Sequence, residues 1–417
     1  MSAESGRPIR ILIVDDSAVM RTLLRAVVMT DARLEVVGTA IHGEAGLRAM
    51  ESLKPDLVLL DVEMPQMDGL ATLRAMRSRG LHLPVIMCST LTQRGAQVTI
   101  EALATGAADY VAKPSGQQSR EAAMDALAHD LVPKILALTT RQTSGSAATP
   151  RAAAQPAARD ARGPSGAVHT PTWMGVPPSL EPAPSALPSR LPDWRVPDSR
   201  VPGQRVQDPR VVVIGVSTGG PAALETLLPA LSADFPLPVL LVQHMPEMFT
   251  KLLAERLDGR CALHVCEAEE GMAVERGHVY VAKGNWHLEV RGDGLRGRAA
   301  LRLTQAAQEN HCRPAADVLF RTAVESYGGA VLGVVLTGMG ADGLEGCRLI
   351  CARGGAVIAQ DQATSAVWGM PGAVAQAGLA QKILPLSAIA GEITQRTYRH
   401  ADETGRSEAA YSQKRVG

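Results

Sequence analysis

The sequence is poor in aromatic side chains and has no excess of charge of either sign. Phe, Trp and Tyr make up 3% of its 417 residues, and 42 Lys and Arg are matched by 42 Asp and Glu. Nucleic-acid-binding proteins carry a basic surface, so this balance argues against a nucleic-acid partner. Apolar residues amount to 46%, so the hydrophobic cores must be built mostly from aliphatic side chains.

Long apolar runs and patterned cysteines are also missing. No apolar run approaches the roughly 18 residues of a membrane span, so we expect no membrane insertion. The segment "MSAESGRPIR" lacks the apolar core of a signal peptide. The six cysteines form no Cys-x-x-Cys pair and no zinc-binding pattern. We therefore expect reduced thiols and a cytoplasmic location.

The first of three compositional regions, residues 8–138, alternates short apolar runs with helical patterns. The expected strands are 10–15, 34–40, 56–61, 83–89 and 109–114. Strands that alternate with helices in this way predict an α/β domain with a doubly wound, five-stranded parallel sheet.

Proline dominates the next region and predicts a linker over residues 139–209. Residues 141–209 hold 13 of the 27 prolines, with Ala, Ser and Arg between them. Such a composition cannot bury enough apolar surface to form a core. We expect an extended linker here and a flexible tail at residues 399–417.

Strand and helix patterns resume at residues 210–398 and predict a second doubly wound α/β domain with a mostly parallel sheet. A hairpin is expected within 287–304, across Asp293-Gly294. The other expected strands are 211–215, 238–244, 263–268, 278–282, 330–338 and 355–361.

Acidic and polar side chains follow successive strands of the first domain. Asp15, Asp16 and Asp61 end the first and third strands, while Ser89 and Lys113 follow the fourth and fifth. Carboxyl ends of parallel strands share one edge of the sheet, so these groups should converge there. Three carboxylates that converge need a cation, and oxygen ligands suit Mg²⁺. The alternative for a single aspartate is a helix cap.

The motifs "VDD", "LLDVEMPQMDG", "CST" and "YVAKP", in this order, resemble the receiver domain of two-component response regulators. The resemblance implies that Asp61 accepts a phosphoryl group from a histidine kinase. It implies further roles for neighbouring residues: Mg²⁺ held by Asp16, Asp61 and the carbonyl of Glu63, with Asp15 assisting through water, and phosphoryl sensing by Ser89, Lys113 and the rotamer switch Tyr110.

The stretch "IGVSTGGP", residues 214–221, joins a predicted strand to a predicted helix through a glycine turn. Such a turn can cradle a phosphate at the helix N-terminus. It also fits the Gly-x-Ser-x-Gly pattern of a nucleophile elbow, centred on Ser217. A helix-capping role is a third interpretation of this serine.

A nucleophilic serine needs a base and an acid at the same sheet edge. His244 ends a predicted strand and is the candidate base, although an ordinary strand-end histidine would look the same. Asp342, in "GMGADG", and Asp361 both follow strands. The pattern alone leaves these two acids open.

The motifs "GVSTGGP", "VQHMP", "NHCRPAADVLF", "LTGMGADG" and "AQDQATSAVWGMP" together resemble the catalytic domain of chemotaxis protein-glutamate methylesterases. The resemblance implies hydrolysis of glutamate methyl esters on chemoreceptors, and deamidation of their glutamines, without a cofactor. By resemblance Ser217 is the nucleophile, His244 the base and Asp342 the acid. Met339 and Thr218 would supply oxyanion-binding N–H groups, and the Thr218 hydroxyl would support His244.

Two points temper this resemblance. The linker is long compared with that of familiar members, which bears on how strongly the receiver inhibits the esterase. The alternative function is a response regulator whose second domain binds a nucleotide or a protein without catalysis. Against it, the chain has neither the Gly-x-Gly-x-x-Gly nor the Gly-Lys-Ser/Thr spacing at this turn.

Overall fold

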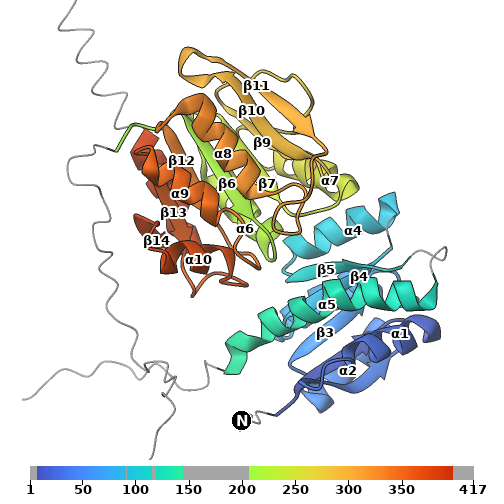
Figure 1. Cartoon of the computed structure of the whole chain (residues 1–417). Helices are drawn as coiled ribbons and strands as arrows, with labels where there is room; N and C mark the ends of the chain where they lie inside the picture. Colours follow the sequence, from blue (N-terminus) through green and yellow to red (C-terminus); the bar gives the residue numbers. More distant parts are fainter. Residues whose placement is uncertain (1–6, 91, 115–118, 144–205, 398–417) are drawn as a thin grey trace, which may run out of the picture.

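A computed structural model describes residues 7–90, 92–114, 119–143 and 206–397. Figure 1 shows two α/β domains, with the N-terminal one drawn in blue to green and the C-terminal one in green to red. The predicted tail, 399–417, and most of the predicted linker lie outside the described residues.

The N-terminal domain is the predicted five-stranded parallel sheet, with strand order β2-β1-β3-β4-β5. Its core strands are buried on both sides, because helices cover both faces of the sheet. Its strands are β1 (Ile9–Val14), β2 (Leu34–Ala40), β3 (Leu57–Asp61), β4 (Val85–Ser89) and β5 (Asp109–Ala112). Its helices are α1 (Ala18–Val28), α2 (Gly43–Leu53), α3 (Gly69–Ser78), α4 (Gln93–Ala104) and α5 (Arg120–Thr143).

Most helices of this domain begin where a polar side chain caps the first turn. Ser17 accepts from the N–H of Met20, and Asp68 accepts from the N–H of Ala71. Helix α5 continues to Thr143, five residues beyond the domain end expected from the sequence. The proline-rich composition starts only after this point, so the expected linker begins inside a helix.

The C-terminal domain has a seven-stranded sheet in the order β14-β13-β12-β6-β7-β9-β8, and all its pairs are parallel. The sheet is β6 (Val211–Val216), β7 (Val239–Gln243), β8 (His264–Glu267), β9 (His278–Val281), β12 (Val331–Val335), β13 (Ala356–Gln360) and β14 (Lys382–Leu384). Strand β14 was missed by the sequence prediction, because it has only three residues and none of them is fully buried.

A separate two-stranded sheet confirms the predicted hairpin. Strands β10 (His287–Asp293) and β11 (Arg298–Thr304) pair antiparallel, and the connection is the 3-10 turn η2 (Gly294–Arg296). The helical elements of this domain are α6 (Gly220–Leu227), η1 (Leu228–Ala230), α7 (Glu247–Asp258), α8 (Ala316–Tyr327), α9 (Leu344–Ala352) and α10 (Met370–Gln376). Residues 386–397 form a last helix. Among the helices in the described ranges, none is both long and apolar enough to cross a membrane.

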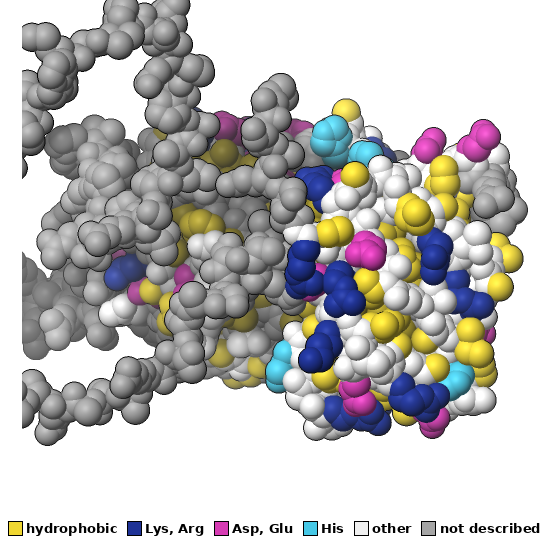
Figure 2. Space-filling model, turned by 90° about the horizontal axis from the view of Figure 1, so that it is seen from below, with side chains coloured by type: hydrophobic (Ala, Val, Ile, Leu, Met, Phe, Trp, Pro, Cys, Tyr) yellow, Lys and Arg dark blue, Asp and Glu magenta, His cyan; other side chains and the backbone are white. Residues whose placement is uncertain are grey.

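The two domains pack through α4 and β5 of the first against α6 and α7 of the second (Figure 1). The ring of Tyr110 stacks on that of Phe249 with centroids 4.6 Å apart and an interplanar angle of 15°. Seen from below Figure 1, basic and acidic side chains are interspersed with apolar ones (Figure 2).

Candidate active site and acidic edge

Three predicted site residues follow neighbouring strands of the C-terminal sheet. Ser217 comes directly after β6, His244 directly after β7, and Asp342 lies in the loop after β12. Strand β6 pairs with β12 on one side and with β7 on the other. The carboxyl ends of parallel strands form one edge, so the fold brings all three residues to the same place.

The turn that carries Ser217 depends on glycine. Gly219 has a φ of +78°, in the left-handed region that disfavours other residues. Gly338, from the neighbouring loop, approaches so closely that a Cβ there would lie 2.8 Å from the Cβ of Ser217. The two glycines therefore let a strand-to-helix turn and a second loop meet at the serine.

Asp342 is almost fully buried and its carboxylate is saturated with donors. Oδ2 lies 2.8 Å from Nε2 of His244 and accepts from the N–H of Ala316 at 2.6 Å. Oδ1 accepts from the N–H groups of Asp317 at 3.1 Å and Gly343 at 3.0 Å. Burial alone would raise the pKa of Asp342, but the bond to His244 and these N–H groups outweigh it and lower the pKa.

His244 is held by its two ring nitrogens. Nε2 faces Asp342, and Nδ1 lies 3.6 Å from Sγ of Cys312. Burial would lower the pKa of His244, but the hydrogen bonds to Asp342 and Cys312 raise it to about 9. A base that uses Nε2 for its acid has only Nδ1 left to accept a proton from a nucleophile.

Neither the Ser217 hydroxyl nor the Thr218 hydroxyl is hydrogen-bonded to His244. Within the described ranges, the Ser217 hydroxyl makes no hydrogen bond to His244 or to any other group. The Thr218 hydroxyl donates to Oδ2 of Asp109, in the N-terminal domain, at 2.5 Å. The expected contact of this hydroxyl with His244 is therefore not seen in this conformation, because the hydroxyl donates its proton to Asp109.

Backbone N–H groups surround Ser217. Those of Met339 and Thr218 have no hydrogen-bond partner among the described residues. The N–H of Gly219, by contrast, donates to the carbonyl of Ala108 in the other domain at 3.1 Å. Two N–H groups remain available at the serine, and a third is occupied by the N-terminal domain.

Asp361, the competing acid, lies elsewhere. Its Oδ1 accepts from both the N–H and the hydroxyl of Thr364, at 2.9 and 2.6 Å. These two hydrogen bonds close a local turn in the loop after β13, and the carboxylate of Asp361 is used in that turn. The geometry gives it no contact with His244.

A cleft of about 890 Å³ opens over Ser217 and His244, and residues of both domains line it. The N-terminal domain contributes Ala108, Asp109 and Tyr110, and the C-terminal domain contributes the loop 308–314. A substrate that reaches Ser217 must therefore pass between the domains.

The N-terminal sheet has its own acidic edge. Asp15 and Asp61 are both buried, and Nζ of Lys113 bridges them at 2.9 and 2.7 Å. Burial raises the pKa of Asp61 to about 6, although Lys113 acts in the opposite direction. The predicted convergence of Asp15, Asp61 and Lys113 is confirmed.

The same edge fits a hard cation. Oxygens of Asp15, Asp16 and Asp61 lie within 4.8 Å of one another, and Asp16 is exposed to solvent. A donor set made only of carboxylates, with an open side, matches the preference of Mg²⁺. The N–H of Glu63 donates to Asp61, which places the residue expected to supply a carbonyl beside the cluster.

The two other predicted phosphoryl-sensing residues have different environments. The Ser89 hydroxyl is buried and donates to the carbonyl of Thr90 at 3.1 Å. Tyr110 is buried between the domains, where Lys134 lies 5.3 Å from its ring centroid. A switch at Tyr110 would therefore act directly on the contact with Phe249.

Sequence reasoning missed three residues of the active-site neighbourhood. Nε2 of Gln243 donates to the carbonyl of Ser217 at 3.0 Å. Cys312 contacts His244, and Nδ2 of Asn310 donates to Asp342 at 2.9 Å. Gln243 is a strand-end neighbour of His244 and could have been found. The other two lie in a loop whose path the pattern does not predict.

Comparison with known proteins agrees with this arrangement. Residues 212–393 match the CheB methylesterase family and residues 11–139 match the response regulator receiver domain. A protein-glutamate methylesterase/protein-glutamine glutaminase of Nocardioides is 46% identical over 94% of this chain and 96% of its own length. The protein of the same description from Trichodesmium erythraeum is 42% identical over 93% of this chain and 98% of its own length.

Solved structures are similar to each domain, and a catalytic domain is among them. The CheB methylesterase catalytic domain of Thermotoga maritima is 41% identical, covers 45% of this chain and 99% of its own, and gives a TM-score of 0.44. The relatives of full length decide between the two functions left open by the sequence. The chain belongs to the chemotaxis protein-glutamate methylesterase/protein-glutamine glutaminase family, hydrolases that carry a receiver domain.

Proposed function

We propose that Ser217, His244 and Asp342 are the catalytic residues of this methylesterase. The observation that carries the proposal is the 2.8 Å contact between Asp342 and His244 at the end of strands that flank the Ser217 turn. Because the carboxylate holds Nε2, the imidazole is oriented with Nδ1 as the proton acceptor.

The reaction proceeds in two halves. Nδ1 of His244 takes the proton of Ser217 as Oγ attacks the ester carbonyl, and His244 then protonates the departing methanol. Water repeats the sequence on the acyl-enzyme and releases the glutamate side chain. The N–H groups of Met339 and Thr218 are the proposed oxyanion donors, because they have no other partner in the described chain. With a glutamine side chain, ammonia leaves in place of methanol.

The thiol of Cys312 blocks the proposed proton acceptor in this conformation. The thiol lies at Nδ1, the nitrogen that Ser217 needs. The imidazole must exchange this contact for the serine hydroxyl before the first proton transfer. The conformation described here is thus a resting one, with the base turned to a thiol and the nucleophile unbonded.

We further propose that the receiver domain keeps the enzyme in this resting conformation. The carbonyl of Ala108 takes the N–H of Gly219, and Asp109 takes the hydroxyl of Thr218. Both contacts lie within two residues of Ser217. Phosphorylation of Asp61 by a histidine kinase would open this interface through β5, since Asp109 and Tyr110 begin that strand.

Asp16, Asp61 and the carbonyl of Glu63 are the proposed Mg²⁺ ligands, with Asp15 assisting through water, and the bound ion would neutralise charge during phosphoryl transfer. Lys113 would pair with the phosphoryl oxygens and the Ser89 hydroxyl would turn toward them. The esterase step is proposed to need no cofactor. Methyl-accepting chemoreceptors are the proposed substrates, and a cytoplasmic location remains a prediction.

For the domain bounds we propose a receiver at residues 8–138, a linker at 139–209, a methylesterase at 210–398 and a tail at 399–417. The family matches and the composition support these limits, although α5 runs to Thr143.

The deciding experiment is methanol release from methylated chemoreceptor membranes. Ser217→Ala should reduce the rate by more than about 10³-fold, because it removes the hydroxyl that is proposed to form the acyl-enzyme. Ser232→Ala, in the loop that follows η1, is the matched control and should keep the wild-type rate. Substantial turnover by a folded Ser217→Ala protein would remove the serine from its proposed role.

A further inference from the structure

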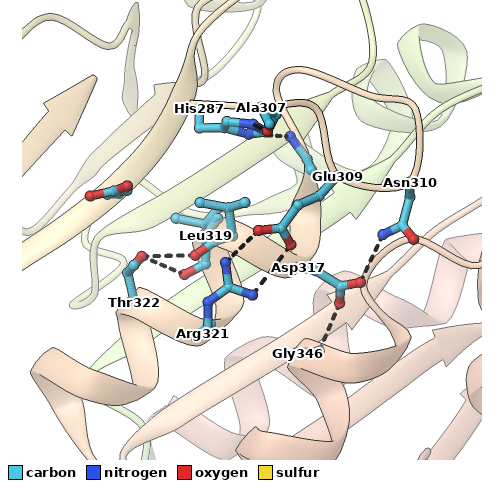
Figure 3. Close-up of polar contacts among 12 residues, drawn as sticks. His287, Ala307, Glu309, Asn310, Asp317, Leu319, Arg321, Thr322 and Gly346 are labelled. Atoms are coloured by element: carbon cyan, nitrogen blue, oxygen red, sulfur yellow. Dashed lines mark hydrogen bonds and ion pairs between the residues drawn. The ribbon is translucent and has the colours of Figure 1, made fainter. Parts of the chain in front are cut away.

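A turn at residues 309–312 contacts both the acid and the base of the proposed triad. Glu309 and Cys312 exchange backbone hydrogen bonds of 3.2 and 2.8 Å, and the residues between them, Asn310 and His311, have φ values of +52° and +61°. Asparagine adopts this left-handed conformation more readily than most residues. Arg321 on α8 anchors the turn through a two-point ion pair with Glu309 (Figure 3).

The side chain of Asn310 bridges two buried carboxylates. Its Nδ2 donates to Oδ1 of Asp342 and to Oδ2 of Asp317, each at 2.9 Å. Figure 3 shows Asn310 above Asp317, whose other oxygen accepts from the N–H of Gly346 at 2.7 Å. One amide group therefore contacts both acids from the wall of the cleft.

Asp317 has no part in the proposed reaction, yet it lies beside the acid that does. Only 5% of its surface is exposed, against 2% for Asp342. Burial raises the pKa of Asp317, and the nearby charge of Asp342 adds to that effect. Two buried carboxylates repel each other unless donors are shared between them.

We propose that Asn310 is a positioning residue of the esterase, whose amide bridges Asp317 and Asp342 and so sets the negative charge that Asp342 presents to His244. This inference rests on the proposed roles of His244 and Asp342. It adds a function for a residue that itself touches neither the nucleophile nor the base.

The direction of the effect follows from the charges. A donor on Asp342 weakens the field of that carboxylate at His244, so loss of the donor should strengthen the field and raise the pKa of His244. A third carboxylate at residue 310 should raise it further, whereas removal of the charge of Asp317 should lower it. The other titratable groups that face the pair are Cys312, Cys347 and the Glu309–Arg321 ion pair, and the variants below leave all of them in place.

The test compares four variants of the full-length protein. Asn310→Gly removes the amide and keeps a residue suited to positive φ, Asn310→Asp keeps the shape and adds a charge, and Asp317→Asn removes one. His311→Gly is the matched control, because it changes the neighbouring left-handed position without touching either acid. Thermal melts establish that each variant is folded.

Two readouts separate a positioning role from mere packing. The first is the pH dependence of basal kcat/KM for methanol release, without a phosphodonor. The second is the imidazole pKa of His244 from nitrogen NMR of histidine-labelled protein, assigned with His244→Gln. We expect midpoints about one pH unit higher for Asn310→Asp, about half a unit higher for Asn310→Gly and about one unit lower for Asp317→Asn. His311→Gly should leave both midpoints at their wild-type positions, and only the midpoints are compared for this variant because His311 lines the cleft.

A fall in rate at every pH with an unmoved midpoint in both Asn310 variants would overturn the inference and leave Asn310 as packing. Shifts of equal sign in Asn310→Asp and Asp317→Asn would overturn it too. The proposed function fails separately, through activity of Ser217→Ala, and the NMR midpoints remain interpretable in that case.

Discussion

Both domains gather carboxylates at the carboxyl edge of a parallel sheet, but they stabilise them in different ways. In the receiver, a side-chain cation bridges Asp15 and Asp61. In the esterase, fixed backbone N–H groups and His244 surround Asp342. Burial raises the pKa of Asp61 to about 6, while that of Asp342 is lowered. Backbone N–H groups hold the charge of Asp342 in place, whereas at the receiver edge a single lysine side chain supplies the donors and can bind another anion instead.

This contrast fits the two proposed roles. An acid that orients a histidine must stay charged through the reaction, and Asp342 has its donors before substrate arrives. An acid that is to be phosphorylated must exchange its partners, and Lys113 can follow the new oxygens because it is a single flexible side chain. The same sheet edge thus serves a permanent charge in one domain and a changing one in the other.

The largest effect is expected when the acid of the esterase is neutralised. Asp342→Asn should lower kcat by about 10³- to 10⁴-fold, because the amide cannot hold His244 in the required tautomer. Asp361→Asn is the matched control on the adjacent strand and should change the rate less than about threefold, since its carboxylate accepts from Thr364 and makes no hydrogen bond to His244 among the described residues. Methanol release measures both, and a larger loss in Asp361→Asn would reverse the assignment.

Neutralising Asp61 in the receiver should affect the stimulation of the enzyme and not its basal rate. Asp61→Asn should keep the basal rate of methanol release and lose stimulation by a small-molecule phosphodonor with Mg²⁺. The physical reason is that an amide cannot form the acyl phosphate, while the esterase edge stays intact. Stimulation of this variant to the wild-type level would exclude control through Asp61.

The contacts between the two edges should contribute a smaller effect. Asp109→Ala removes the receiver group that holds the Thr218 hydroxyl and should raise basal activity by roughly threefold to tenfold, since a hydrogen bond to a charged group contributes about 1.5–3 kcal/mol, only part of which acts on the domain equilibrium. Asp130→Ala is the control. Both Asp109 and Asp130 pair with Lys134, at 3.7 and 2.8 Å, but Asp130 is half exposed and makes no hydrogen bond to Thr218. An unchanged basal rate in Asp109→Ala would mean that this contact does not hold the resting state.

Much of the fold and part of the site could be predicted from the sequence. Buried strands such as β1 and β6 are continuous aliphatic runs, and short α/β connections force their carboxyl ends together. This is why Ser217, His244 and Asp61 could be placed from their positions after strands. Strand β14 was missed because three residues carry too little pattern to distinguish them from a loop.

What the pattern could not predict depends on loops and on contacts between domains. Asp342 and Asp361 follow adjacent strands and look alike in sequence, and they differ only in their contacts, because Asp342 bonds to His244 while Asp361 bonds to Thr364. The hydroxyl of Thr218 donates to Asp109, which lies 109 residues earlier in the sequence. Asn310 contacts Asp342 only because the turn that carries it has two left-handed residues. Local periodicity carries no information about either.

The smallest expected effect is on the stability of the receiver domain. It tests whether the buried charge of Asp61 destabilises that domain. Because burial raises the pKa of Asp61 from 3.8 to about 6, the folded domain prefers the protonated acid. Its stability should therefore fall as pH rises from about 4 through 6. Asp61→Asn does not titrate and should escape this loss.

We accordingly expect Asp61→Asn to raise the melting temperature of the receiver transition by on the order of 5 °C at pH 7.5, and by roughly a third as much at pH 4.5, where only the first part of the loss has occurred. Asp16→Asn, at the exposed carboxylate of the same cluster, should give a smaller gain because solvent already stabilises that charge. Calorimetry of the full chain without Mg²⁺ measures both. A gain of equal size at the two pH values would show that the amide stabilises the domain by packing, and that the charge of Asp61 is well tolerated beside Lys113.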